Sequence, residues 1–173
     1  MMTPTDLSAT HNPQVLSFEH LGVFSVTDTL VAADPRYVES RFAGLRTGFL
    51  PVCSTLPAEP GMWQAFAVRS DDDQSVSFLL TCHSDELENR SPFDDVEALG
   101  VLTIDTGQVT IVDAEQRDHP ALQSAAEATD RKVGPRMIHT YGVIAELPKT
   151  GIFPLYASRG ARKRVVFVAF THD

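Results

Sequence analysis

Histidine, cysteine and carboxylate residues stand close together at two places in this sequence, and these side chains could do chemistry. The two groups are Cys82-His83 with Asp85, and Asp113 and Glu115 with Asp118 and His119. A structural zinc site normally takes four ligands, usually from closely spaced pairs. Adjacent residues of a strand, such as Cys82 and His83, point to opposite faces. We therefore expect neither a metal nor another cofactor.

Nucleophilic catalysis is the second chemistry that these residue types allow. Cys53 or Cys82 could act as a nucleophile if a histidine lay beside it in space. No motif surrounds either cysteine, and the sequence has no G-x-S-x-G elbow, no glycine-rich phosphate loop and no H-E-x-x-H. We assign no catalytic residue, and a hydrolase with a histidine-centred site stays a third-ranked hypothesis.

Acidic residues outnumber basic residues, and they are concentrated in one segment. The chain has 23 Asp and Glu against 14 Lys and Arg, a net charge of -9, which argues against general nucleic-acid binding because phosphates need a basic face. The acidic segment contains six carboxylates: Asp85, Glu86, Glu88, Asp94, Asp95 and Glu97. It interrupts the strand pattern over residues 84–98, so we expect an irregular loop, either simply solvated or facing a basic protein partner.

Positive charge gathers near the C-terminus and allows a different hypothesis, a binding module for a small anionic ligand. Its cleft between two sheets would be lined by aromatic and basic side chains, namely Tyr37, Trp63, Tyr156, Arg159, Arg162 and Arg164. Tyr37 belongs to the sequence Asp34-Pro35-Arg36-Tyr37. This sequence fits either a site or a turn in which Asp34 accepts backbone N–H bonds.

Short strands separated by polar turns dominate the rest of the pattern. The clearest hairpin joins residues 62–69 to residues 75–82. One helix is predicted over about residues 118–131, because Asp118 or His119 can cap it and Pro120 suits its first turn. Further strands are predicted at residues 15–18, 22–26, 30–33, 48–53, 137–147, 152–158 and 164–171. This pattern favours an antiparallel β-sandwich or a partly open barrel with one helix.

One passage occurs twice, at residues 21–34 and 99–113. Each copy has an apolar run, a polar break, a second apolar run and an aspartate. This order is typical of two strands joined by a tight turn. We expect two equivalent strand pairs, each a hairpin or a bent strand, related by a pseudo-two-fold axis.

Length and composition bound the class of protein. The 173 residues, 43% of them hydrophobic, fit a single domain. We predict a loose tail over residues 1–13 and one β-rich domain over residues 14–173. No apolar stretch approaches the length of a membrane span, and the N-terminus does not resemble a secretory signal. We therefore expect a cytoplasmic protein.

Several of these segments also carry a family resemblance. They are Asp34-Pro35-Arg36-Tyr37, residues 105–113, residues 151–157 and residues 165–170. In these segments the chain resembles bacterial proteins grouped as domain of unknown function 4241, over about half its length. It departs from their pattern at Lys149-Thr150-Gly151, where an acidic, glycine-rich turn is expected. The resemblance implies a β-rich bacterial domain and no particular activity.

These observations rank three functions. The first is a non-enzymatic protein-binding domain, such as a cytosolic immunity or inhibitor-type protein that neutralises a basic partner through the acidic segment. The module for a small anionic ligand is second, and the hydrolase is third.

Overall fold

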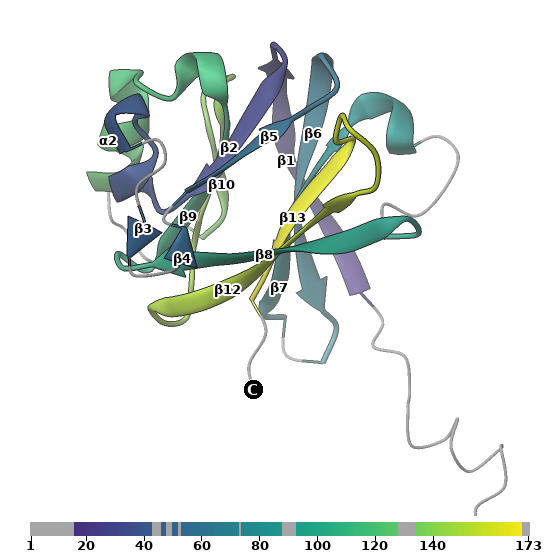
Figure 1. The fold of residues 1–173 in the computed structure, drawn as a ribbon. Helices are drawn as coiled ribbons and strands as arrows, with labels where there is room; N and C mark the ends of the chain where they lie inside the picture. Colours follow the sequence, from purple (N-terminus) through teal and green to yellow (C-terminus); the bar gives the residue numbers. More distant parts are fainter. Residues whose placement is uncertain are drawn as a thin grey trace, which may run out of the picture.

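Two antiparallel β-sheets pack face to face in the computed structural model, as Figure 1 shows. The structure describes residues 16–42, 46–47, 50–51, 53–72, 74–87, 93–127 and 134–170. Both sheets have two edges and do not close on each other, so the predicted β-sandwich with one helix is confirmed and a closed barrel is not formed. The tail predicted at residues 1–13 lies outside the described residues.

Each sheet combines strands from both ends of the chain. The larger sheet has the order β1 (Leu16–Val26), β6 (Gly61–Ser70), β7 (Val76–His83), β13 (Val165–Ala169), β12 (Gly151–Ser158), β8 (Val96–Ile104). The smaller sheet has the order β10 (Arg136–Ile138), β11 (Gly142–Glu146), β9 (Gln108–Asp113), β2 (Thr29–Ala33), β5 (Cys53–Pro57). A small separate pair consists of β3 (Arg46–Thr47) and β4 (Leu50–Pro51).

Short helices fill the connections. They are η1 (Pro35–Tyr37), η2 (Ser40–Phe42), η3 (Ser84–Leu87), η4 (Ala114–Gln116) and α2 (Pro120–Glu127). Proline in the first turn of α2 costs no helical hydrogen bond, which is why the predicted helix begins there. The remainder of that prediction, residues 128–131, lies outside the described residues.

The main core lies between the two sheets. Alternate side chains of β12 point inward, so Phe153, Leu155 and Ala157 are buried while their neighbours are more exposed. Phe24 and Trp63 face the same core and are completely buried. This apolar burial is the main driving force for the two sheets to pack together.

Each sheet also has an outer face on which a second cluster of apolar side chains packs. On the smaller sheet, Leu122 of α2 and Val38 pack on Val31 of β2. On the larger sheet, Phe93 packs against Phe78 and Phe167, with ring centroids 5.4 and 5.0 Å apart. Phe93 lies within the acidic segment, just before β8, so it anchors that segment on this face.

The repeated passage forms equivalent strand pairs, as predicted, but neither pair is a hairpin. β1 and β8 lie at the two edges of the larger sheet, whereas β2 and β9 lie side by side in the smaller sheet. Each short turn therefore passes the chain from one sheet to the other. The physical reason is that the apolar residues before and after each turn face one shared core.

The final aspartate of each copy holds the turn of the other copy. Asp34 is completely buried and accepts hydrogen bonds from the backbone N–H groups of Asp105 and Thr106, at 2.7 and 2.8 Å. Asp113 accepts from the N–H and hydroxyl groups of Thr27, at 3.3 and 3.1 Å. Asp34 also accepts from the Arg36 N–H, so it does cap the turn described above.

The match between the two copies extends to the neighbouring strands of both sheets. We call residues 16–87 the first half and residues 93–170 the second half. The larger sheet runs β1-β6-β7 in the first half and then, in mirrored order, β13-β12-β8 in the second. The smaller sheet repeats this relation, with β5-β2 meeting β9-β11 and β10 added at one edge. The two halves therefore contribute equivalent strands in equivalent order to both sheets.

Two strand predictions need correction. Residues 137–147 do not form one strand, because the chain turns between β10 and β11 at residues 139–141, with His139 at a φ of 47°. The described residues of the strand predicted at residues 48–53 are extended, but they belong to two strands rather than one. Leu50 and Pro51 form β4, and Cys53 begins β5 of the smaller sheet. Residues 48, 49 and 52 lie outside the described residues.

Candidate functional site

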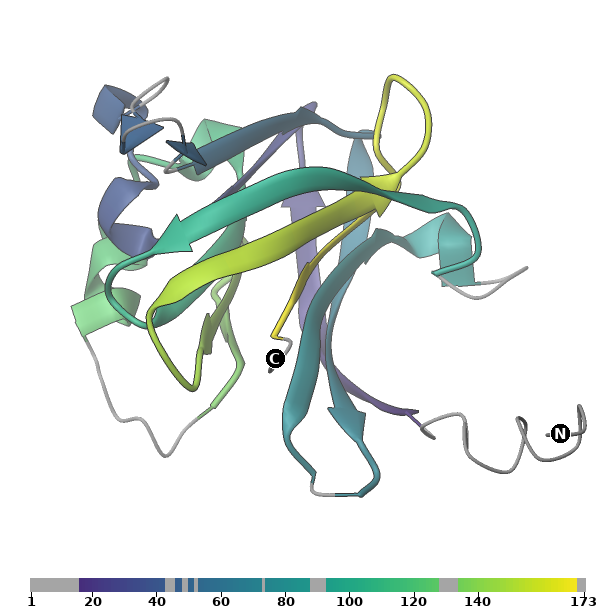
Figure 2. The same cartoon turned by 60° about the horizontal axis from the view of Figure 1, so that its bottom comes forward.

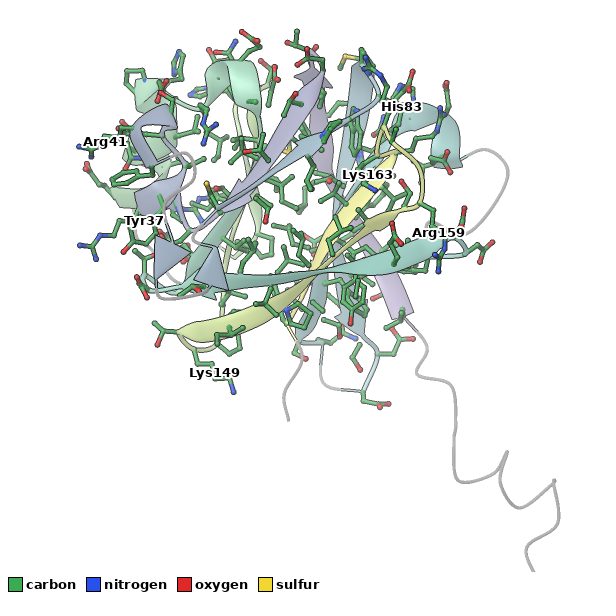
Figure 3. All side chains as sticks on the ribbon, viewed as in Figure 1. Tyr37, Arg41, His83, Lys149, Arg159 and Lys163 are labelled. Carbon is green, nitrogen blue, oxygen red and sulfur yellow. The ribbon has the colours of Figure 1, made fainter. Side chains whose placement is uncertain are left out.

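A cluster of opposite charges lies where η3, the start of β8 and the β12–β13 connection meet. We call it the charged corner, and its members are Asp85, Glu86, Asp95, Glu97, Arg159, Lys163 and Arg164. Antiparallel pairing of β8 with β12 sets Val96 opposite Ser158, so the acidic start of β8 lies beside the basic end of β12. Figure 2 shows these two strands side by side, and Figure 3 marks Arg159 and Lys163.

Arg159 joins the two carboxylates that flank Val96. Its guanidinium lies 3.3 Å from Asp95 Oδ1 and 3.4 Å from Glu97 Oε2. Its backbone N–H donates to the Asp95 carbonyl oxygen. More than half of the Arg159 side chain is exposed, so each of these ion pairs contributes little stability in water.

Lys163 and Arg164 make the more buried contacts of the corner. Lys163 Nζ donates to the Gly160 carbonyl oxygen at 2.9 Å and lies 3.8 Å from Glu97. The Arg164 guanidinium donates to the carboxylate of Glu86, and Glu86 is only 8% exposed. A buried carboxylate needs such a partner because burial removes it from water.

The acidic segment is therefore only partly the open surface that we expected. Glu86 is buried and paired, which excludes it as an exposed partner-binding residue. Glu97 is partly covered by its cationic neighbours. Asp85, Asp94 and Asp95 are exposed, and Glu88 lies outside the described residues.

The aromatic residues predicted to line a ligand cleft are not brought together with the predicted arginines. Trp63 is completely buried and donates its indole N–H to the Glu59 carbonyl oxygen, so it cannot line an open cleft. Tyr156 stacks on Phe167 on the outer face of the larger sheet. Figure 3 places Tyr37 far from Arg159, on the opposite side of the molecule.

Tyr37 and the predicted arginines have local partners. The Tyr37 hydroxyl donates to Asp105 at 2.8 Å, and this hydrogen bond, together with burial, raises the pKa of Tyr37. Arg162 donates to the Ala58 carbonyl oxygen. Arg159 and Arg164 face carboxylates, as described above. The charge that would attract an anion is thus largely neutralised within the corner.

His83 borders the charged corner, and both of its ring nitrogens are engaged. Nδ1 accepts from the Asp85 backbone N–H at 3.2 Å, so the proton lies on Nε2, which faces the Pro60 carbonyl oxygen at 3.1 Å. This arrangement holds η3 and the β5–β6 turn together. His119 likewise accepts from the Ala121 N–H at the start of α2. Both imidazoles have structural roles.

Cys82 points to the opposite face of β7 from His83. It is completely buried among apolar side chains of the larger sheet's outer face. Burial, with a smaller effect of Glu86, raises the pKa of the Cys82 thiol to about 12. A thiol of this kind is a poor nucleophile at neutral pH.

In the described part of the chain, no three His, Cys, Asp or Glu side chains gather as a metal site would require. No helix in the same residues is long and apolar enough to cross a membrane.

Lys163 is the corner residue that the sequence hypotheses did not include. Its place in the basic run of residues 159–164 was the available signal.

Comparisons with family models, curated proteins and solved structures found no match to this chain. The resemblance to domain of unknown function 4241 therefore stays a prediction.

Proposed function

We propose that this chain is a non-enzymatic protein-binding domain that engages a basic partner at the charged corner. The supporting observation is that Asp85, Asp94 and Asp95 are exposed, and that the cations near two of them, Arg159 and Arg164, also pair with Glu97 and Glu86. A basic side chain from a partner can pair with these three acids without burying an unpaired charge. A cytoplasmic immunity or inhibitor-type role fits this chemistry.

The symmetry of the fold supports the choice of this site. Glu97–Arg159 has a counterpart in the first half, Glu19–Arg69, where the guanidinium lies 2.8 Å from the carboxylate. The same glutamate–arginine ion pair therefore occurs at equivalent positions in both halves. The connection β12–β13, which supplies Lys163 and Arg164, is basic, whereas the equivalent β6–β7 turn carries Asp71 and Asp72. Among the described residues, the basic side of the corner therefore belongs to the second half alone.

A pair of charge-matched variants tests this proposal. The corner variant is Asp85→Asn, Asp94→Asn and Asp95→Asn. The control is Asp28→Asn, Asp71→Asn and Asp72→Asn, which changes the net charge equally at exposed turns elsewhere. Partners captured from a bacterial lysate by the wild-type chain are identified by mass spectrometry and purified.

Association kinetics with the purified partner then decide the matter. We expect the corner variant to associate about tenfold more slowly at low salt, and the control to associate like the wild type, because steering acts through charges near the contact. High salt should reduce the difference. Equal rates for the two variants, or capture of no partner that binds directly, would overturn the proposal.

A further inference from the structure

We infer that the two halves of this chain are duplicated β-units that bind each other specifically, and that their covalent connection is not needed for this binding. The strand registers carry the inference. Val26 pairs with Gly61 in the first half, and Ile104 pairs with Gly151 in the second. Both glycines have positive φ, 128° and 140°.

Neighbouring positions extend the match. Trp63 and Phe153 follow these glycines by two residues, and both are buried in the main core. A bulge falls at the corresponding place in each edge pair. On β1 it skips Leu21 between His20 and Gly22, and on β8 it skips Leu99 opposite the step from Leu155 to Tyr156. Equal irregularities at equal positions are a strong sign of duplication, because bulges are specific features of a fold.

The interface between the halves has the form of a symmetric dimer interface. Two antiparallel ladders cross it, β7 with β13 and β2 with β9. The two aspartates add reciprocal contacts, since Asp34 binds the turn of the second half and Asp113 binds the turn of the first. Contacts that are exchanged in this way characterise two-fold interfaces.

At the pseudo-two-fold axis, equivalent residues of the two halves lie opposite each other, and their different sizes favour pairing of a first half with a second half. Ala32 lies opposite Ile111, and Leu80 lies opposite Phe167. All four are at most 4% exposed. If two first halves paired, alanine would face alanine at this position and leave a void. If two second halves paired, isoleucine would face isoleucine and phenylalanine would face phenylalanine, which would overpack the core. The preferred partner of each half is therefore the other half.

Cleavage of the folded chain tests whether the connection is needed. A protease site is inserted between Leu87 and Phe93, and the purified full-length protein is cut under native conditions. We expect the two fragments to elute together as a one-to-one complex with the far-UV circular dichroism of the uncut protein. The complex should form again after dilution from denaturant. Fragments that separate, self-pair or aggregate at micromolar concentration would overturn the inference.

Exchange of the axis residues tests the selectivity independently of cleavage efficiency. In the cut protein, Ala32→Ile or Ile111→Ala alone should weaken the complex at least tenfold, and the two together should restore most of the affinity. The matched control combines Ala32→Ile with Leu122→Ala, which removes a buried side chain from the other face of the smaller sheet. If both double variants lose affinity additively, the axis residues do not select the partner.

Discussion

Asp34 and Asp113 occupy equivalent positions but are held to different degrees. Asp34 accepts four hydrogen bonds, from three backbone N–H groups and the Thr106 hydroxyl, all at 2.7 to 2.9 Å. Asp113 accepts three at 3.1 to 3.4 Å. Removing an acceptor leaves these donors unsatisfied, which costs about 1–3 kcal/mol for each buried group.

We therefore predict that Asp34→Ala lowers the free energy of unfolding by roughly 3 kcal/mol or more, and Asp113→Ala by about 1–2 kcal/mol. Urea unfolding at neutral pH measures both. Losses of equal size would show that the shorter hydrogen bonds of Asp34 add no stability.

Cys82 gives the unfolding free energy a dependence on alkaline pH. Its folded-state pKa of about 12 lies above the ordinary value of 9.0 because the thiolate would be buried. Below pH 9 the thiol stays protonated in both states, so its contribution is complete. Above pH 9 the unfolded chain ionises while the folded chain does not, so stability falls as pH rises toward 12.

The test compares wild type with Cys82→Ala. The slope of unfolding free energy between pH 8 and pH 10.5 should be shallower in the variant, by at most about 1.4 kcal/mol per pH unit. Tyrosine ionisation contributes to both proteins and cancels in the comparison. Parallel slopes would mean that the thiol is reachable by water in the folded state.

At the scale of elements, the sequence pattern was sufficient to predict strand pairing where the two strands are consecutive and joined by a short turn. The β6–β7 hairpin was predicted because a short polar turn separates two strand-forming runs. The β1–β2 pair has the same pattern, yet its strands belong to different sheets. An apolar run, a turn and another apolar run look alike whether the strands pair or cross between sheets, so the sequence could predict strands here but not their partners.

The charged corner shows the same limit for the site. Its acids and cations lie more than 60 residues apart, and they meet only because β8 pairs with β12 and β7 pairs with β13. Sequence composition identified both groups, which is why Asp95, Glu97 and Arg159 were all named in advance. It assigned them to different sites, because nothing local indicated that each would neutralise the other.

Gly142, in β11 of the smaller sheet, tests how tightly that sheet is packed, and Gly22, in β1 of the larger sheet, serves as the comparison. A Cβ on Gly142 of β11 would lie 2.3 Å from the Ile111 carbonyl oxygen, which is backbone of β9. A Cβ on Gly22 of β1 would lie 2.7 Å from Met137 Cγ, part of a flexible side chain. We predict that Gly142→Ala lowers the free energy of unfolding several times more than Gly22→Ala does. The paired backbone of β9 cannot shift to admit a methyl group, whereas the flexible side chain of Met137 can change its rotamer.

Thermal unfolding of the two alanine variants provides the measurement. Gly22→Ala is the matched control, since both glycines lie in strands and neither has a positive φ. Similar melting temperatures for the two variants would indicate that β11 and β9 can separate locally to admit a methyl group.

At the scale of the whole molecule, the two halves should unfold together although each is a distinct unit. The main core contains side chains of both, including Trp63 from the first half and Phe153 from the second. If one half unfolds, the other loses its core and both cross-half ladders. Neither half can then remain folded alone, so the transition should be two-state.

The only tryptophan makes this testable, because Trp63 and Phe153 are equivalent positions. In the wild type, tryptophan fluorescence reports on the first half. In the double variant Trp63→Phe with Phe153→Trp it reports on the second. We predict that fluorescence and far-UV circular dichroism give the same urea midpoint in each protein, even if the exchange itself changes stability. A fluorescence transition that precedes the circular dichroism transition in either protein would show that one half unfolds first, and that the shared core does not couple them.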